Sequence, residues 1–163
     1  MSPLIVRVVE VRVAVIVDST RTAAEFGDRR WRGLLDQHDA IVQNAVTRFD
    51  GRIIKSTGDG VLATFMGPGR AIAAAKSIDQ GVAGIGLSVR AGIHTGECEI
   101  RGDDIGGLAV HLAARIASLA GSRELLVSRT VKDLVVGADI GFTDAGEREL
   151  KGVPGTWHLY SID

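Results

Sequence analysis

The chain has 163 residues, of which 45% are hydrophobic and 24% are charged, and its formal net charge is −1. This length fits one domain over residues 1–163 and is enough to bury a real core. The near-zero charge argues against a protein that coats nucleic acid or a membrane surface, but it is compatible with a local basic pocket for one nucleotide. No apolar run reaches the length of a membrane span, and no signal peptide is evident. We therefore expect a cytoplasmic protein with no nucleic-acid partner.

Periodicity and turn signals predict that strands and helices alternate along the chain. In order they are a strand at 4–17, a helix at 29–49, strands at 52–56 and 61–65, a helix at 68–78, a strand at 87–95 continued as a hairpin at 97–101, a helix ending at 119, a strand at 125–128, a helix at 129–134, and strands and turns at 140–160. This alternation favours an α/β or α+β class, with one mixed sheet and helices on one side.

The first candidate site is the segment Lys55-Ser56-Thr57-Gly58-Asp59-Gly60. A hairpin here would carry Lys55 and Asp59 at the end of a rigid sheet, and its glycines would let a ligand approach closely. A carboxylate in this position can hold Mg²⁺, which takes oxygen ligands and shares them with phosphates. Taken alone, the pattern fits an ordinary surface turn equally well, because Asp-Gly is a common hairpin turn.

Two further segments carry candidate residues. After the glycine-rich stretch at 102–107, His111 and Arg115 are four residues apart, so they share a helix face from which Arg115 could bind phosphate oxygens. Solvated side chains on a helix surface are the commoner outcome for such a pair. Lys151, which precedes a glycine near the C-terminus, is a weak signal by itself.

Together and in this order, these segments resemble the class III adenylate/guanylate cyclase family, in particular its compact actinobacterial, mycobacterial-type members. The resemblance extends from about Val13 to Tyr160 and includes the blocks at 27–31, 55–60, 90–96, 104–115 and 150–152. A diguanylate cyclase would need a Gly-Gly-acidic-acidic hairpin signature, which the sequence lacks. The resemblance implies an α+β sandwich with a ferredoxin-like core, a mixed and mostly antiparallel sheet with helices, and a homodimer whose active sites lie at the interface.

The resemblance also implies a role for each candidate residue. Lys55 and Asp104 match the family's purine-reading pair, and a lysine donor with a carboxylate acceptor suits adenine. Arg115 matches the transition-state arginine and Lys151 the triphosphate lysine. Asp59 matches one of two aspartates that hold Mg²⁺ or Mn²⁺. The implied substrate is therefore ATP.

Two positions depart from the family pattern. Val15 stands where the first metal aspartate is expected, and Asp18 stands at a usual glycine. Asp18 could replace the missing ligand only if a loop bend shortens the roughly 10 Å that three extended residues span. His111 replaces the asparagine that orients the ribose, and a histidine can still donate a hydrogen bond there.

Two functions follow from this pattern. The first is an adenylate cyclase that converts ATP to cyclic AMP and pyrophosphate for intracellular signalling, with activity lowered by the change at Val15. The second is a degenerate cyclase-homology domain that binds nucleotide or a partner subunit without turnover. The otherwise complete set of candidate residues favours the first function, and Val15 favours the second.

Overall fold

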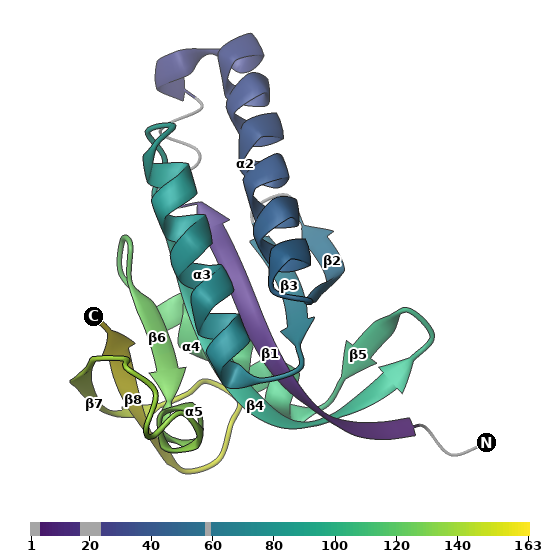
Figure 1. Cartoon of the computed structure of the whole chain (residues 1–163), viewed down its shortest axis with the longest axis vertical. Coiled ribbons are helices and arrows are strands. Elements are labelled where there is room, and N and C mark those ends of the chain that lie inside the picture. The colour runs from purple at the N-terminus through teal and green to yellow at the C-terminus, as the bar shows by residue number, and fades with distance from the viewer. Residues whose placement is uncertain (1–3, 17–23, 58–59) are drawn as a thin grey trace.

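The computed structural model describes residues 4–16, 24–57 and 60–163 (Figure 1). Its elements are β1 (Leu4–Ile16), α2 (Asp28–Arg48), β2 (Arg52–Thr57), β3 (Gly60–Phe65), α3 (Pro68–Ala83), β4 (Val89–Arg101), β5 (Asp104–Gly106), α4 (Leu108–Leu119), β6 (Leu125–Ser128), α5 (Arg129–Leu134), β7 (Phe142–Glu149) and β8 (Thr156–Ile162). The predicted helices and strands are thus present, although α3 continues past residue 78 to Ala83. None of the helices in the described ranges has both the length and the apolar character needed to cross a bilayer.

The strands form one eight-stranded sheet in the order β2-β3-β1-β4-β6-β8-β7, and β5 pairs with β4. Among the described strands, β4 and β6 run parallel and the other neighbours run antiparallel. The predicted mixed, mostly antiparallel α+β sheet is confirmed. The predicted break after residue 95 is wrong, because β4 continues without interruption to Arg101 and its hairpin partner is β5.

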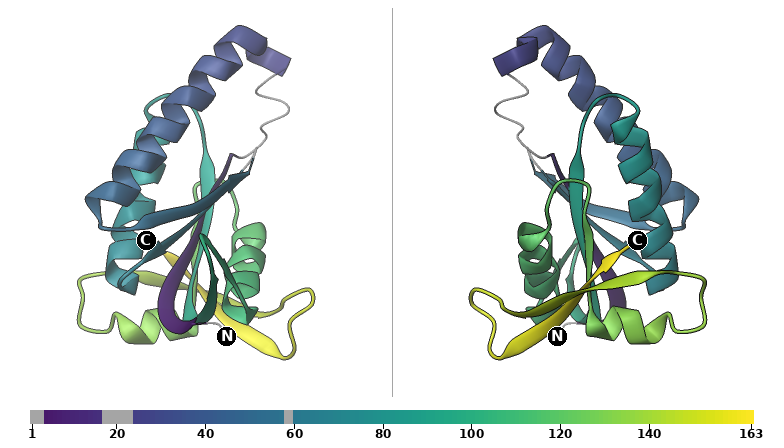
Figure 2. Two further views of the ribbon diagram at one scale, coloured as in Figure 1. Left: turned by 90° about the vertical axis from the view of Figure 1, so that its right-hand side faces the viewer. Right: turned by 90° about the vertical axis from the view of Figure 1, so that its left-hand side faces the viewer.

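Helices cover both faces of the sheet. Figure 2 shows α2 and α3 on one face and α4 on the opposite face. The expectation that all helices lie on one side is therefore wrong. Apolar periodicity shows that a helix has a buried side, but it does not show which face of the sheet that side covers. The β4–β5 hairpin reverses the chain just before α4 begins, and α4 then packs against β4, β1 and β6 from the second face.

The two faces have separate hydrophobic cores. The largest cluster joins α2 and α3 to residues of β3, β4 and β6, and its fully buried side chains include Ile72, Ile78 and Ile93. The α4 face carries two smaller clusters. The Ile105 cluster comprises Leu62, Cys98, Ile105 and Ala109, with Ile54 and Val110 partly buried against it. The Leu150 cluster comprises Leu112, Ile116, Ala120, Leu126, Leu150, Val153 and Leu159, with Ala145 and Trp157 against it.

Helix α4 lies very close to β4 at Gly92. A Cβ atom at this position would overlap the backbone amide of Ala117 and would stand 2.7 Å from the carbonyl oxygen of Ala113. Only a glycine allows the two backbones to approach this closely. Gly92 therefore sets the distance between the sheet and the helix that carries His111 and Arg115.

Candidate active site

Strand β2 and the β4–β5 hairpin bring the predicted purine-reading residues together. Lys55 and Asp104 are 49 positions apart in sequence, yet Nζ of Lys55 lies 3.3 Å from Oδ1 and 3.5 Å from Oδ2 of Asp104. Oδ1 of Asp104 also accepts a hydrogen bond of 2.8 Å from the backbone amide of Ile105. Both side chains are about half exposed, at 50% and 55%. A positive donor and a negative acceptor thus converge where a ligand can reach both.

A β-bulge in β2 determines which way Lys55 faces. Ile53 pairs with Ala63, whereas Lys55 pairs with Leu62, so the register shifts at Ile54. Paired residues of antiparallel strands face the same side of a sheet, and Leu62 belongs to the Ile105 cluster. The bulge therefore places Lys55 on the α4 face. Without the bulge, residue 54 would pair with Leu62, and Lys55 would face the other side of the sheet.

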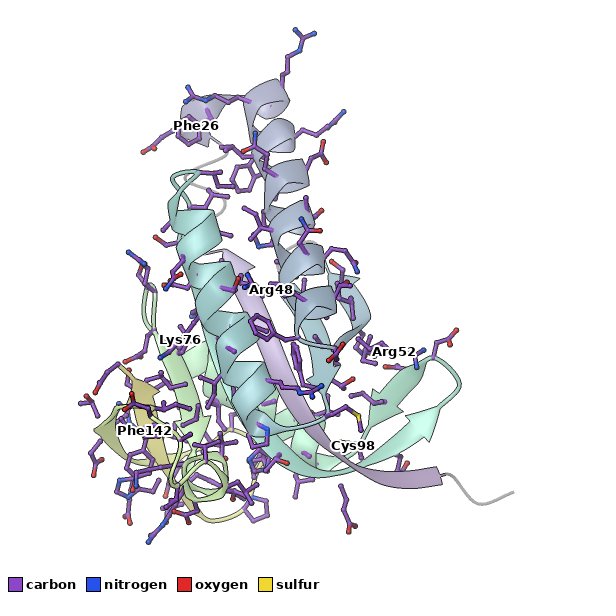
Figure 3. All side chains as sticks on the ribbon, viewed as in Figure 1. Phe26, Arg48, Arg52, Lys76, Cys98 and Phe142 are labelled. Carbon is purple, nitrogen blue, oxygen red and sulfur yellow. The ribbon has the colours of Figure 1, made fainter. Side chains whose placement is uncertain are left out.

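A second ion pair lies beside the first. Nη2 of Arg52 contacts Oδ1 of Asp103 at 3.3 Å, and Figure 3 shows Arg52 at the edge of β2 that faces the β4–β5 hairpin. Because both side chains are strongly exposed, this contact adds little stability. It nevertheless connects the same two elements as the contact between Lys55 and Asp104.

Helix α4 carries the next two candidates. His111 is exposed, and Arg115 is half-buried one turn further along. Nε of Arg115 is buried and has no hydrogen-bond partner among the described residues. A buried donor atom left without a partner is costly, so such an atom in a native structure calls for an explanation. A bound anion would satisfy it.

Lys151 lies in the turn between β7 and β8, and its position relative to α4 is set by its neighbour. Leu150 is buried in the same cluster as Leu112 and Ile116 of α4. Lys151 itself is exposed. It lines a shallow hollow of about 590 Å³ together with Glu149, Leu150, Val153, Gly155 and Thr156.

The two small clusters arrange the five candidates in a spatial order. Neighbours of Lys55 and Asp104, namely Ile54 and Ile105, belong to the Ile105 cluster. Neighbours of Arg115 and Lys151 belong to the Leu150 cluster. His111 lies between Val110 of the first cluster and Leu112 of the second. Along α4, His111 therefore lies between the end that packs near Lys55 and Asp104 and the end that packs near Lys151 and carries Arg115.

Arg90 is a further basic group of this region to which the sequence analysis gave no role. Its Nε is also buried without a partner in the described part of the chain, and its Nη1 donates to the carbonyl oxygen of Ser118 at 3.3 Å. Ser118 lies one turn after Arg115 and donates its hydroxyl hydrogen to the Arg115 carbonyl oxygen. Arg90 belongs to the segment at 90–96 that resembles the family, but only the fold shows that its side chain reaches the end of α4.

The register of β1 bears on the missing metal ligand. Val13 pairs with Ala91 of β4, but after a register shift Val15 pairs with Arg90. Position 15 therefore has a cation, and no second carboxylate, as its β4 neighbour. The predicted ligands Asp18 and Asp59 lie outside the described residues. Within the described residues, no group of three His, Cys, Asp or Glu side chains is placed to hold a metal ion.

One buried histidine supports this part of the fold. His94 of β4 is 5% exposed, and its Nδ1 lies 2.7 Å from Oγ of Ser128. Oγ of Ser128 also accepts a hydrogen bond from the backbone amide of Val131 at 3.4 Å, which caps α5. Burial lowers the pKa of His94 from 6.5 to about 4. The imidazole is therefore neutral at physiological pH and connects β4 to β6 and α5.

This fold and this arrangement of residues define a class of protein. The model of the adenylate and guanylate cyclase catalytic domain matches residues 70–163, which is more than half of the chain. The chain belongs to this family, the class III nucleotidyl cyclases, whose members generally use divalent cations.

Individual relatives agree with this assignment. One relative is a Rhizobium meliloti (strain 1021) protein named as a candidate adenylate cyclase 3. It is 30% identical over 141 residues, which cover 81% of this chain and 23% of that protein. An uncharacterised protein of Mycobacterium tuberculosis is 31% identical over 121 residues, covering 71% of this chain and 42% of that protein. The chain thus spans less than half the length of these curated relatives.

A solved structure shows the same fold. The adenylate/guanylate cyclase/hydrolase from Silicibacter pomeroyi superposes with a TM-score of 0.85 at 21% identity, covering 99% of this chain and 98% of the other. This likeness confirms the class III cyclase architecture that the sequence predicted. At this level of identity it concerns the fold alone.

Proposed function

We propose that this chain is an adenylate cyclase, which joins the ribose 3′-oxygen of ATP to the α-phosphorus and releases pyrophosphate. The observation that carries the proposal is the convergence of Lys55 and Asp104, with 3.3 Å between Nζ and Oδ1. The proposal concerns a cytoplasmic catalytic domain that makes cyclic AMP for signalling.

Adenine presents an acceptor at N1 and a donor at its 6-amino group. Nζ of Lys55 can donate to the first, and a carboxylate oxygen of Asp104 can accept from the second. Guanine presents the reverse pattern, with an acceptor at O6 and a donor at N1. An acidic residue at 55 and a small residue at 104 would fit guanine better, so the charges present favour ATP.

The remaining residues follow the order of the substrate. With the base at Lys55 and Asp104, the ribose would lie at His111 and the phosphates would extend toward Arg115, Lys151 and Arg90. Arg115 would stabilise the charge that develops as the pentacovalent phosphorus forms, and its unpartnered Nε would then gain an acceptor. Mg²⁺ or Mn²⁺, held through Asp59 with Asp18 as a weaker candidate, would neutralise phosphate charge.

The active form in this proposal is a homodimer with its sites at the interface. The purine-reading and metal-binding residues of one chain then serve opposite sites. Each site would combine Lys55, Asp104, His111, Arg115 and Lys151 of one subunit with Asp59 of the other.

A direct assay tests the proposal. The purified chain is incubated with ATP or GTP in the presence of Mn²⁺ or Mg²⁺, and cyclic nucleotide is quantified. We expect cyclic AMP to exceed cyclic GMP, and Arg115→Ala to lower cyclic AMP formation at least about 100-fold, which corresponds to about 2.7 kcal/mol of barrier. Equal use of both nucleotides would contradict the proposed preference for adenine. Formation of no cyclic nucleotide from either substrate would contradict the proposed cyclase activity.

The pairing of Val15 with Arg90 favours a second candidate function, a domain that binds nucleotide without turnover. A valine supplies no oxygen to a cation, and an arginine beside it can hold phosphates without any reaction. ATP binding that is measurable by calorimetry and weakened by Lys55→Ala, without cyclic AMP formation, would support this function over the first.

A further inference from the structure

His111 differs from the other three histidines of the chain in its surroundings. His38 contacts Asp39 at 3.1 Å, His94 contacts Ser128 at 2.7 Å and His158 contacts Asp144 at 2.7 Å. In the described part of the structure, the imidazole of His111 has no such contact, and its ring is exposed on α4. Both ring nitrogens are therefore available to a ligand.

The position of His111 relates it to one part of a nucleotide. It lies between the clusters that anchor Lys55 and Asp104 on one side and Arg115 and Lys151 on the other. A base bound at the first pair and phosphates bound at the two cations leave the ribose at His111. This step rests on the adenylate cyclase function proposed above.

The attacking 3′-hydroxyl must lose a proton, and few of the described groups can accept it. Lys55, Arg90, Arg115 and Lys151 are cations with no free lone pair. The carboxylate of Asp104 is already engaged by Lys55 and by the Ile105 amide.

The family carries a carboxylate at position 15 that helps to activate this hydroxyl. In this chain the residue is Val15, which pairs with Arg90 of β4. Among the described groups near the ribose, the imidazole of His111 is the remaining acceptor, and histidine is the commonest general base in enzymes.

We propose that His111 is the general base of the cyclisation. As the 3′-oxygen forms its bond to the α-phosphorus, an imidazole nitrogen of His111 takes the hydroxyl proton. The bond between the α-phosphorus and the bridging oxygen breaks, and pyrophosphate leaves with that electron pair. The imidazolium then returns its proton to water, so the step needs no further reactant.

The test separates a base from a residue that only positions the ribose. His111→Asn keeps a hydrogen-bond donor but cannot take the proton, whereas His111→Ala removes both functions. If His111 is the base, both variants lose about 100-fold in kcat, within the range for general-base catalysis, while the affinity for a non-hydrolysable ATP analogue changes less than threefold. Added imidazole restores activity to His111→Ala, and among substituted imidazoles the more basic ones restore more.

His158→Asn is the matched control, because it removes a histidine from β8 without touching α4. It should retain wild-type kcat and show no response to imidazole. Suppose that the wild type makes cyclic AMP and that His111→Asn has wild-type kcat. This result overturns the proposal that His111 is the general base and leaves the proposed adenylate cyclase function standing. A wild type that makes no cyclic AMP overturns both. Unchanged analogue affinity in both variants shows that they are folded.

Discussion

At the scale of single residues, the proposed adenylate cyclase function predicts that base selection depends on two charges. Lys55 and Asp104 meet at 3.3 Å on the α4 face, and each complements one group of adenine. In the double variant Lys55→Glu with Asp104→Gly, the donor becomes an acceptor and the acceptor is lost. A mismatched polar group costs about 1–3 kcal/mol.

We therefore expect the ratio of kcat/KM for ATP over GTP to fall at least about tenfold, or 1.4 kcal/mol. Initial rates with both nucleotides measure it. Arg52→Ala with Asp103→Ala, the neighbouring exposed pair, is the matched control and should leave the ratio within about twofold, a difference below 0.5 kcal/mol. A ratio unchanged in the first double variant would show that other groups recognise the base.

Val15 is the second residue whose replacement is informative. Its backbone pairs with that of Arg90. Val15→Asp restores a carboxylate at the position where the family binds a cation. We expect cyclic AMP production to rise at least about tenfold, equal to 1.4 kcal/mol of barrier, with a smaller change in nucleotide affinity.

Val15→Asn, of similar size but without charge, controls for packing and should increase turnover less. Asp18→Ala should reduce activity less than Asp59→Ala. If Asp18→Ala instead abolishes activity while Val15→Asp has no effect, then Asp18 is the metal ligand and the family register at the end of β1 is wrong.

At the scale of elements, the distance between α4 and β4 depends on Gly92. Replacing it by alanine drives a methyl group into the backbone of α4 at Ala117 and Ala113. Since backbone cannot move aside as a side chain can, we expect Gly92→Ala to reduce the free energy of unfolding by about 1–3 kcal/mol or more. Urea denaturation followed by circular dichroism measures this loss.

Gly33 is the matched control for this prediction. It lies within α2, and a Cβ there would meet no heavy atom within 4 Å. Gly33→Ala should therefore raise stability by up to about 1 kcal/mol through helix propensity. A Gly92→Ala variant as stable as the wild type would show that α4 can shift away from the sheet.

The order and type of the elements could be predicted from local sequence, because periodicity and turn residues are local signals. The end of α2 illustrates this, since the predicted stop at Asp50-Gly51 agrees with a helix that ends at Arg48 and with Asp50 at φ 59°. The face that α4 covers could not be predicted, because it depends on how the β4–β5 hairpin reverses the chain.

In the candidate site, too, some features could be predicted from the sequence and others depend on how the elements pack. The structure brings Lys55 within 3.3 Å of Asp104, but their role in reading a purine stays a prediction. The contact of Arg90 with Ser118 and the unpartnered Nε of Arg90 could not be predicted in this way, because both depend on the packing of β4 against the last turn of α4. The roles given to His111, Arg115 and Lys151 remain predictions.

At the scale of the whole molecule, the homodimer proposal requires that each site draws on two chains. Lys55→Ala and Asp59→Ala should each inactivate the protein, and mixing the two variants should restore activity, because a heterodimer has one site with both residues intact. With equal mixing, half of the dimers are heterodimers with one working site, so we expect about a quarter of wild-type activity. Adding Asp59→Ala to a Lys55→Ala/Asp59→Ala double variant should restore none.

The buried His94 makes the stability of the whole fold depend on pH. Its pKa is about 4 in the folded protein, because burial disfavours the charged ring, and 6.5 when unfolded. Below pH 6.5 the unfolded chain binds the proton more readily, so the free energy of unfolding falls as pH decreases from 6.5 to 4, with no further loss from this residue below that. The full effect is on the order of 3 kcal/mol.

His94→Gln should therefore have a flatter stability curve between pH 6.5 and pH 4 than the wild type. Chemical denaturation across this range measures both proteins, and the difference between the two curves isolates the histidine from the carboxylates that titrate in the same range. Parallel curves would show that His94 is protonated in the folded state without cost.

The bulge in β2 also limits which changes this sequence can tolerate. One extra residue in this strand changes which of its positions lie on the α4 face, as the pairing of Lys55 with Leu62 shows. Substitutions at such positions can change the chemistry gradually, one side chain at a time. Deleting the extra residue would instead exchange core and site positions over the rest of the strand. We therefore expect point substitutions at the end of β2 to be tolerated better than single-residue insertions or deletions there.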